Sequence, residues 1–119
     1  MTVPVEVKQS PLHGKGVFAS RNIAKGEMLA KCYMVLIHVN ENLPECLATL
    51  QFPWIEEYDA ICISDVGSFF NHSKEPNAEV FDRDYENLIQ TFVAKTDILE
   101  GNEITIYYND AFEAFVSER

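Results

Sequence analysis

The sequence predicts a β-rich fold, mostly strands with a few short helices. Apolar and polar residues alternate along several short stretches, which is the period-two pattern of half-buried strands. Turn-forming residues separate these stretches at short intervals, as they do in chains built from hairpins. Helical patterning is confined to two brief segments. These observations leave two classes open, all-β and β-rich α+β.

The first third of the chain contains three expected strands. Residues 3–7 alternate, but Pro4 cannot donate to a ladder and belongs at a strand start or a sheet edge. A loop over 10–16 then leads to a short strand at 17–19, and residues 28–39 form a long apolar strand. One parity of the long strand is expected in the core, namely Cys32, Met34 and Leu36.

The remaining elements follow from cap and turn signals. They are, in chain order, a helix over 42–50, a hairpin over 52–63 with its turn at Glu56 and Glu57, a hairpin over 79–94 with a polar turn at 83–87, a strand over 104–108 and a short helix capped by Asp110.

One pattern occurs twice. Residues 19–26 and 94–101 both read Ala-x-x-[Asn/Asp]-Ile-x-x-Gly. Two copies are too few for a solenoid. They predict two similar turns, each with an isoleucine plug and a glycine.

Composition limits the partners and the compartment. The 119 residues suffice for one domain, and a net charge of −10 repels nucleic acid and attracts cations, so we expect a basic peptide as partner. Such a charge also simply aids solubility. No window is long enough for a membrane span and no signal pattern is present. Three scattered cysteines predict a reducing, intracellular compartment, and no Cys or His spacing predicts a metal site.

The stretch 68–77 organises the chain. Two aromatics precede Asn71 and His72, whose side chains both donate and accept hydrogen bonds, and a Pro-Asn turn follows. A buried polar pair needs partners, since leaving one group unsatisfied costs about 1–3 kcal/mol. Taken alone, these residues favour a turn whose Asn and His bond nearby backbone over a ligand site.

Three segments together resemble the signature motifs of SET-domain lysine methyltransferases, in that family's order. They are Ser-Pro-Leu-His-Gly-Lys-Gly-Val-Phe-Ala at 10–19, Phe-Asn-His-Ser-x-x-Pro-Asn at 70–77, and Gly-Asn-Glu-Ile-Thr-x-x-Tyr at 101–108. The resemblance is to the minimal viral and bacterial members. It implies a single domain over 1–119 without pre-SET or zinc-binding post-SET segments, folded as a β-clip of small curved sheets. It also implies a C-terminal pseudoknot that places the second and third motifs side by side.

The resemblance further implies S-adenosyl-L-methionine as cofactor and methyl transfer to a lysine amine. Gly14, Lys15 and Gly16 match the Gly-x-Gly whose backbone approaches the methionine end of that cofactor. Asn71 and His72 match the pair that hydrogen-bonds it.

Tyr108 matches the tyrosine at the transfer site, the expected catalytic residue. It would orient a neutral amine, because an apolar channel and a neighbouring sulfonium both disfavour the ammonium form. Phe52 and Tyr107 are expected to line the substrate channel. Leu50 stands where small relatives have a second channel tyrosine, which is a departure from the family pattern.

The aromatic tail 109–119 leaves two interpretations of Phe112, a cofactor cover or an anchor for the last helix. The family favours a histone tail as substrate, hence the nucleus, with the cytoplasm expected for another protein substrate, and the viral analogy favours a homodimer. Leu50 keeps a second hypothesis open, a catalytically weak or inactive module that binds cofactor or a lysine-bearing peptide.

Overall fold

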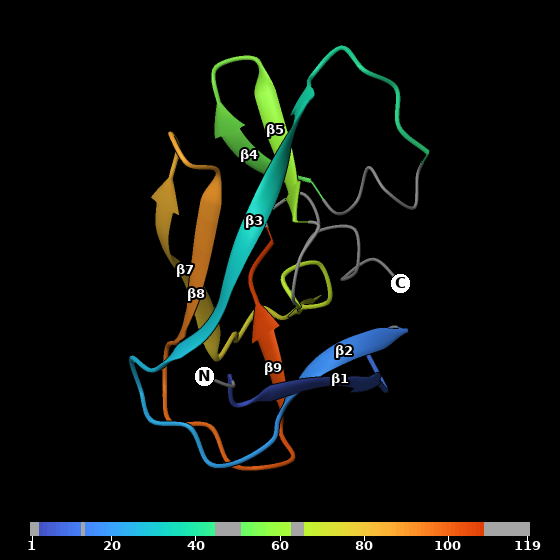
Figure 1. Cartoon of the computed structure of the whole chain (residues 1–119). Helices are drawn as coiled ribbons and strands as arrows, with labels where there is room; N and C mark the ends of the chain where they lie inside the picture. Colours follow the sequence, from blue (N-terminus) through green and yellow to red (C-terminus); the bar gives the residue numbers. More distant parts are fainter. Residues whose placement is uncertain (1–2, 13, 45–50, 63–65, 109–119) are drawn as a thin grey trace.

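The chain is built from strands in two sheets (Figure 1). The computed structural model describes residues 3–12, 14–44, 51–62 and 66–108, and the β-rich class predicted from the sequence is confirmed. No helix in this part of the chain is long and apolar enough to cross a membrane. The strands described are β1 (Val5–Gln9), β2 (Lys15–Ala19), β3 (Met28–His38), β4 (Phe52–Ile55), β5 (Tyr58–Cys62), β6 (Asn71–His72), β7 (Ala78–Asp84), β8 (Ile89–Ala94) and β9 (Glu103–Ile106).

The four-stranded sheet has the order β1–β2–β9–β6. β1 lies at its edge, as Pro4 predicts, and pairs antiparallel with β2 as far as Gln9 opposite Lys15. The loop between them is shorter than expected. Because Gly16 pairs with Lys8, the second glycine of the Gly-x-Gly lies inside β2 and not in the loop.

The five-stranded sheet has the order β4–β5–β3–β8–β7 and is curled. Its edge strands approach each other, since the ring of Trp54 on β4 lies 5.2 Å from that of Tyr85, just after β7. The predicted core parity of β3 is confirmed, with Cys32 and Met34 buried and Leu36 packed against the same core. The concave side therefore holds the apolar interior.

Several boundaries differ from the expected ones. β7 continues through Arg83 and Asp84, which were expected in the turn, because Arg83 Nε donates to Oε1 of the fully buried Gln90 at 2.8 Å. Among the expected helical residues, Asn42 to Pro44 are described and are not helical. Residues 45–50 and 109–119, which hold the rest of both expected helices, lie outside the described residues.

The two repeated turns pair with each other. Ile23 and Ile98 are both buried and exchange backbone hydrogen bonds of 2.7 and 2.8 Å as an antiparallel bridge. The Asn or Asp side chain of each turn also accepts a hydrogen bond from a backbone N–H of the other turn. The Lys25 N–H donates to Asp97 Oδ1 at 2.8 Å, and the Glu100 N–H donates to Asn22 Oδ1 at 2.8 Å. Two copies of one pattern thus form a clasp with local twofold symmetry, which joins the two sheets.

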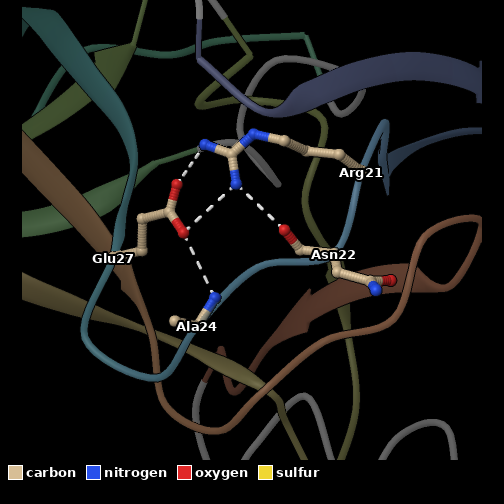
Figure 2. Close-up of polar contacts among 4 residues, drawn as sticks. All are labelled: Arg21, Asn22, Ala24 and Glu27. Carbon is tan, nitrogen blue, oxygen red and sulfur yellow. Dashed lines mark hydrogen bonds and ion pairs between the residues drawn. The ribbon is translucent and has the colours of Figure 1, made fainter.

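The first turn has an additional brace (Figure 2). The guanidinium of Arg21 donates to the carboxylate of Glu27 and to the Asn22 carbonyl, and the Ala24 N–H donates to the same carboxylate. The hydrogen bond from Arg21, followed by that from Ala24, lowers the pKa of Glu27. These bonds are exposed, and they fix the conformation of the turn that precedes β3.

β9 is inserted between β2 and β6, far from both in sequence. Figure 1 shows β9 beside β2. It pairs antiparallel with β2 and parallel with β6, with Asn71 opposite Thr105. The side-by-side placement of the second and third motifs is therefore confirmed. The strand ends at Ile106, two residues before its expected end, and the Tyr108 N–H bonds the His72 side chain rather than a strand.

Candidate active site

The three motifs meet at a single carboxylate. Ser10 Oγ donates to the two oxygens of Glu103 at 2.7 and 2.9 Å, and Asn71 Nδ2 donates to Glu103 Oε2 at 2.7 Å. The same amide donates to the Lys15 carbonyl at 3.2 Å. Ser10 and Lys15 belong to the first motif, Asn71 to the second and Glu103 to the third. Ser10 and Asn71 are both buried, so these bonds fix the relative positions of the three segments.

Gly16 is required by this cluster. A Cβ at this position would lie 2.3 Å from Glu103 Oε2 and 3.0 Å from Asn71 Nδ2. Gly14 has a different reason to be glycine, since its φ of +46° is left-handed and nothing lies within 4 Å of where its Cβ would be. Lys15 between them presents its carbonyl to Asn71. Gly14 is thus needed for its backbone conformation, whereas Gly16 lets the side chains of Glu103 and Asn71 lie close to the backbone.

The side chain of Asn77 forms hydrogen bonds with the backbone of β9. Its Nδ2 donates to the Glu103 carbonyl at 2.9 Å, and its Oδ1 accepts from the Thr105 N–H at 2.8 Å. The side chain therefore extends the pairing of β6 by one residue position. The sequence predicted Asn77 as a turn residue and as the end of the second motif, without a hydrogen-bonding role. The sequence signal for this role is an amide side chain directly after Pro76, because proline has no N–H for backbone pairing and a neighbouring amide can bond the strand instead.

His72, Tyr107 and Tyr108 form an aromatic cluster. The ring centroid of His72 lies 4.9 Å from that of Tyr107 and 5.4 Å from that of Tyr108. The Tyr108 backbone N–H donates to His72 Nδ1 at 3.0 Å, so the proton of the neutral imidazole belongs on Nε2. This side-chain contact is one that sequence analysis did not anticipate. It sets the position of Tyr108, two residues after the end of β9.

The Tyr108 hydroxyl is held inside the site. It donates to the carbonyl of the buried Phe70, the residue just before β6. Burial, and to a lesser extent the charge of Glu103, raise the pKa of Tyr108 to about 12. The phenol is therefore protonated at neutral pH. It can donate or accept a hydrogen bond, but it is not available as a base.

A pocket of about 320 Å³ lies beside Tyr108. Phe52, Tyr107 and Tyr108 all line it, so the structure brings together three of the residues predicted for the transfer site and its channel. Ala78 and Val80 of β7 supply another wall, which sequence analysis did not predict. Leu50 and Phe112, also predicted for the site, lie outside the described residues.

Comparison with known families identifies the architecture. The SET domain family model matches residues 14–109, which include most of the first motif and the whole of the other two. The chain belongs to the SET domain family. Members of this family are generally protein-lysine methyltransferases.

Solved structures contain SET domains of the same fold. The crystal structure of a Plasmodium falciparum protein proposed to be a histone methyltransferase matches with a TM-score of 0.77 and 28% identity, over 92% of this chain and 96% of that one. A chain from the structure of ctPRC2 in complex with H3K27me3 and H3K27M matches with a TM-score of 0.73 and 21% identity, over 92% of this chain and 15% of that one. A search of curated proteins gave no match.

The residues of this SET domain suit S-adenosylmethionine. A carboxylate and amide and carbonyl oxygens surround the junction, and these favour a cationic ligand over an anionic one. The space beside Gly14 leaves its backbone open to a ligand. Within the described ranges no group of Cys, His and acidic residues has the arrangement of a metal site.

Proposed function

We propose that this SET domain is a protein-lysine N-methyltransferase that uses S-adenosyl-L-methionine. The observation that carries the proposal is the position of Tyr108. Its hydroxyl bonds the Phe70 carbonyl, its backbone bonds His72, and the residue lines the pocket. The side chain thus belongs both to the polar junction of the three motifs and to the pocket wall.

The cofactor would be held by the first and second motifs. Gly14, Lys15 and Gly16 would offer backbone groups, while Asn71 and His72 would offer polar atoms at the start of the second motif. When bound, the cofactor supplies a methyl group on a sulfonium. The bonds from Asn71 to Glu103 and to Lys15 orient its amide in advance, which reduces the entropy lost on binding.

The lysine would enter through the pocket between Phe52 and Tyr107. An ordinary lysine has a pKa near 10.4, and apolar walls disfavour its charged form. The Tyr108 hydroxyl, protonated because its pKa is about 12, orients the neutral amine by hydrogen bonding and does not take its proton. Alignment and a neutral amine are the main demands of an in-line displacement.

The substrate would be a basic protein, with a histone tail as the leading choice. The net charge of −10 attracts a basic chain, and the Plasmodium protein of similar fold is itself proposed to be a histone methyltransferase. A nuclear location follows if the substrate is a histone, and a cytoplasmic one otherwise. The homodimer expected by analogy remains a prediction.

Methyl transfer from labelled S-adenosylmethionine to core histones and other basic proteins tests the proposal. We expect label on lysine, and we expect Tyr108→Phe to reduce kcat at least about a hundredfold with cofactor affinity within about threefold, because only the oriented hydroxyl is lost. Tyr33→Phe, on the exposed face of β3, is the control. Label on a non-histone protein alone would support the methyltransferase activity and reject a histone as the substrate. No label on any protein, with the cofactor bound, would favour a binding module.

A further inference from the structure

One wall of the pocket comes from outside the three motifs. It is formed by Ala78, Val80 and Arg83 of β7, which lie opposite three buried residues of β8. These three share the concave face of the curled sheet, because the bulge between Val80 and Asp82 shifts the alternation by one residue. Arg83 is thus a cation on an otherwise apolar wall.

Arg83 is fixed in place rather than mobile at the rim. Its Nε donates to Oε1 of Gln90, whose side chain is fully buried. That bond uses one of the five N–H groups of the guanidinium. No hydrogen bond or ion pair to the remaining four is present within the described ranges. A guanidinium on a half-buried residue that lines a pocket favours an anionic partner.

The charges around the pocket agree with this requirement. Among the described lining residues, Arg83 and Lys95 are cations and Glu79 is an acid, so these residues carry a net charge of +1 while the whole chain carries −10. Glu79 lines the pocket, but it has the opposite parity to Ala78 on β7, so its side chain leaves the strand on the face opposite to that of Arg83. Lys95, next to Ala94, is likewise of opposite parity, which leaves Arg83 as the charged residue of this face. No carboxylate of the described lining residues shares the concave face with Arg83.

We propose that the pocket selects a lysine with an acidic residue close to it in the substrate chain, and that this carboxylate pairs with Arg83. The inference rests on the proposed function, which makes the pocket the lysine site. A carboxylate fits the planar fork of a guanidinium in a bidentate manner, which a neutral side chain cannot match. The anionic field of the whole domain still attracts a basic protein. The substrate class is therefore a lysine-rich protein with Glu or Asp beside the methylated lysine.

Paired peptides test this selection. Each fluorescent peptide has one central lysine in a Gly/Ser background and a single Glu moved through the flanking positions, with a Gln counterpart for each. Binding is measured by anisotropy and methylation by label from S-adenosylmethionine. At one flanking position we expect the Glu peptide to bind about tenfold more tightly than its Gln counterpart. Arg83→Gln should reduce this preference to less than about twofold.

Two further variants keep the result interpretable. Lys31→Gln makes the same change in net charge at an exposed position of β3 that does not line the pocket, and it should retain the full preference. Arg83→Lys keeps the charge without the fork and should give an intermediate preference. Equal binding of Glu and Gln peptides at every position, or a preference that survives Arg83→Gln, would overturn the inference. A Glu preference in binding without methylation would support the inference and contradict the proposed function.

Discussion

At the scale of single residues, Glu103 connects segments that are distant in sequence. Its two oxygens accept hydrogen bonds from Ser10 and from Asn71, which lie 93 and 32 positions away along the chain. The same carboxylate leaves no room for a side chain at position 16. One acid therefore accounts for a glycine and for the orientation of an amide that we assign to the cofactor.

Replacing Glu103 tests this role. Glu103→Ala removes the acceptor of two buried donors and should lower the free energy of unfolding by about 2 kcal/mol. Glu103→Gln should lower it by about 1 kcal/mol, because the Ser10 hydroxyl can rotate to accept from the new amide. Urea unfolding measures both. Equal losses in the two variants would show that the loss does not come from these hydrogen bonds.

Tyr108 makes stability depend on pH at the alkaline end. Its pKa is about 12 in the folded chain and 10.0 in the unfolded one, so the folded state keeps a proton that the unfolded state loses. The contribution is complete below pH 10 and disappears as pH rises through 12. We expect wild type to lose about 2 kcal/mol more than Tyr108→Phe between about pH 9 and pH 11.5.

The control for this titration is Tyr33→Phe, whose ring is 56% exposed. Urea unfolding of the three proteins at the two pH values gives the comparison. If wild type and Tyr108→Phe lost the same free energy on moving to the higher pH, Tyr108 would not be the shifted group.

At the scale of elements, the two repeated turns act as one unit. The bonds from Lys25 to Asp97 and from Glu100 to Asn22 are equivalent under the local symmetry. We expect Asn22→Ala and Asp97→Ala each to lower the free energy of unfolding by about 1 kcal/mol. The exchange variant Asn22→Asp with Asp97→Asn keeps both acceptors and should remain within about 0.5 kcal/mol of wild type. A loss confined to one alanine variant would contradict the symmetric clasp.

The sequence predicted the local features of these elements well. Alternation and turn residues are local signals, and they indicated both hairpins, the long β3 and two similar turns. They could not indicate that the turns pair with each other, because that contact joins Ile23 to Ile98. They placed Arg83 in a turn, since its anchor on Gln90 forms only when β7 and β8 pair. The placement of β9 beside β6 came from family resemblance, not from the residues, and its pairing with β2 was not predicted.

The candidate site was partly predictable for the same reason. Asn71, His72 and Tyr108 were located by motif. The bond of the Tyr108 backbone to His72, and the supporting bonds of Asn77, depend on the parallel pairing of β6 with β9. Such pairing between distant segments has no local sequence signal.

At the scale of the whole molecule, the net charge and the charges of the pocket have different signs and different ranges. The net charge of −10 acts over about 10 Å at 0.1 M salt. The cations of the pocket act only at contact. In our proposal, the domain as a whole attracts a basic substrate, whereas Arg83 discriminates among lysines once the chain has docked.

Salt should therefore weaken substrate binding more than cofactor binding. We expect KM for a basic protein to rise at least about fivefold between 50 and 500 mM salt, because screening removes the long-range attraction. The dissociation constant of the proposed cofactor, which we expect to be held by hydrogen bonds at contact distance, should change less than about twofold. Calorimetry and steady-state kinetics at the two salt concentrations make the comparison. Equal salt dependence of both constants would argue against steering by the net charge.

We propose that three distant segments form one cofactor site around Asn71. Calorimetric titration of S-adenosylmethionine into wild type and into Asn71→Ala tests it directly. We predict one cofactor bound per wild-type chain and an affinity at least about tenfold lower in the variant, because its amide no longer links Glu103 to Lys15. No binding to the wild-type protein, or equal affinity in the two proteins, would contradict the account.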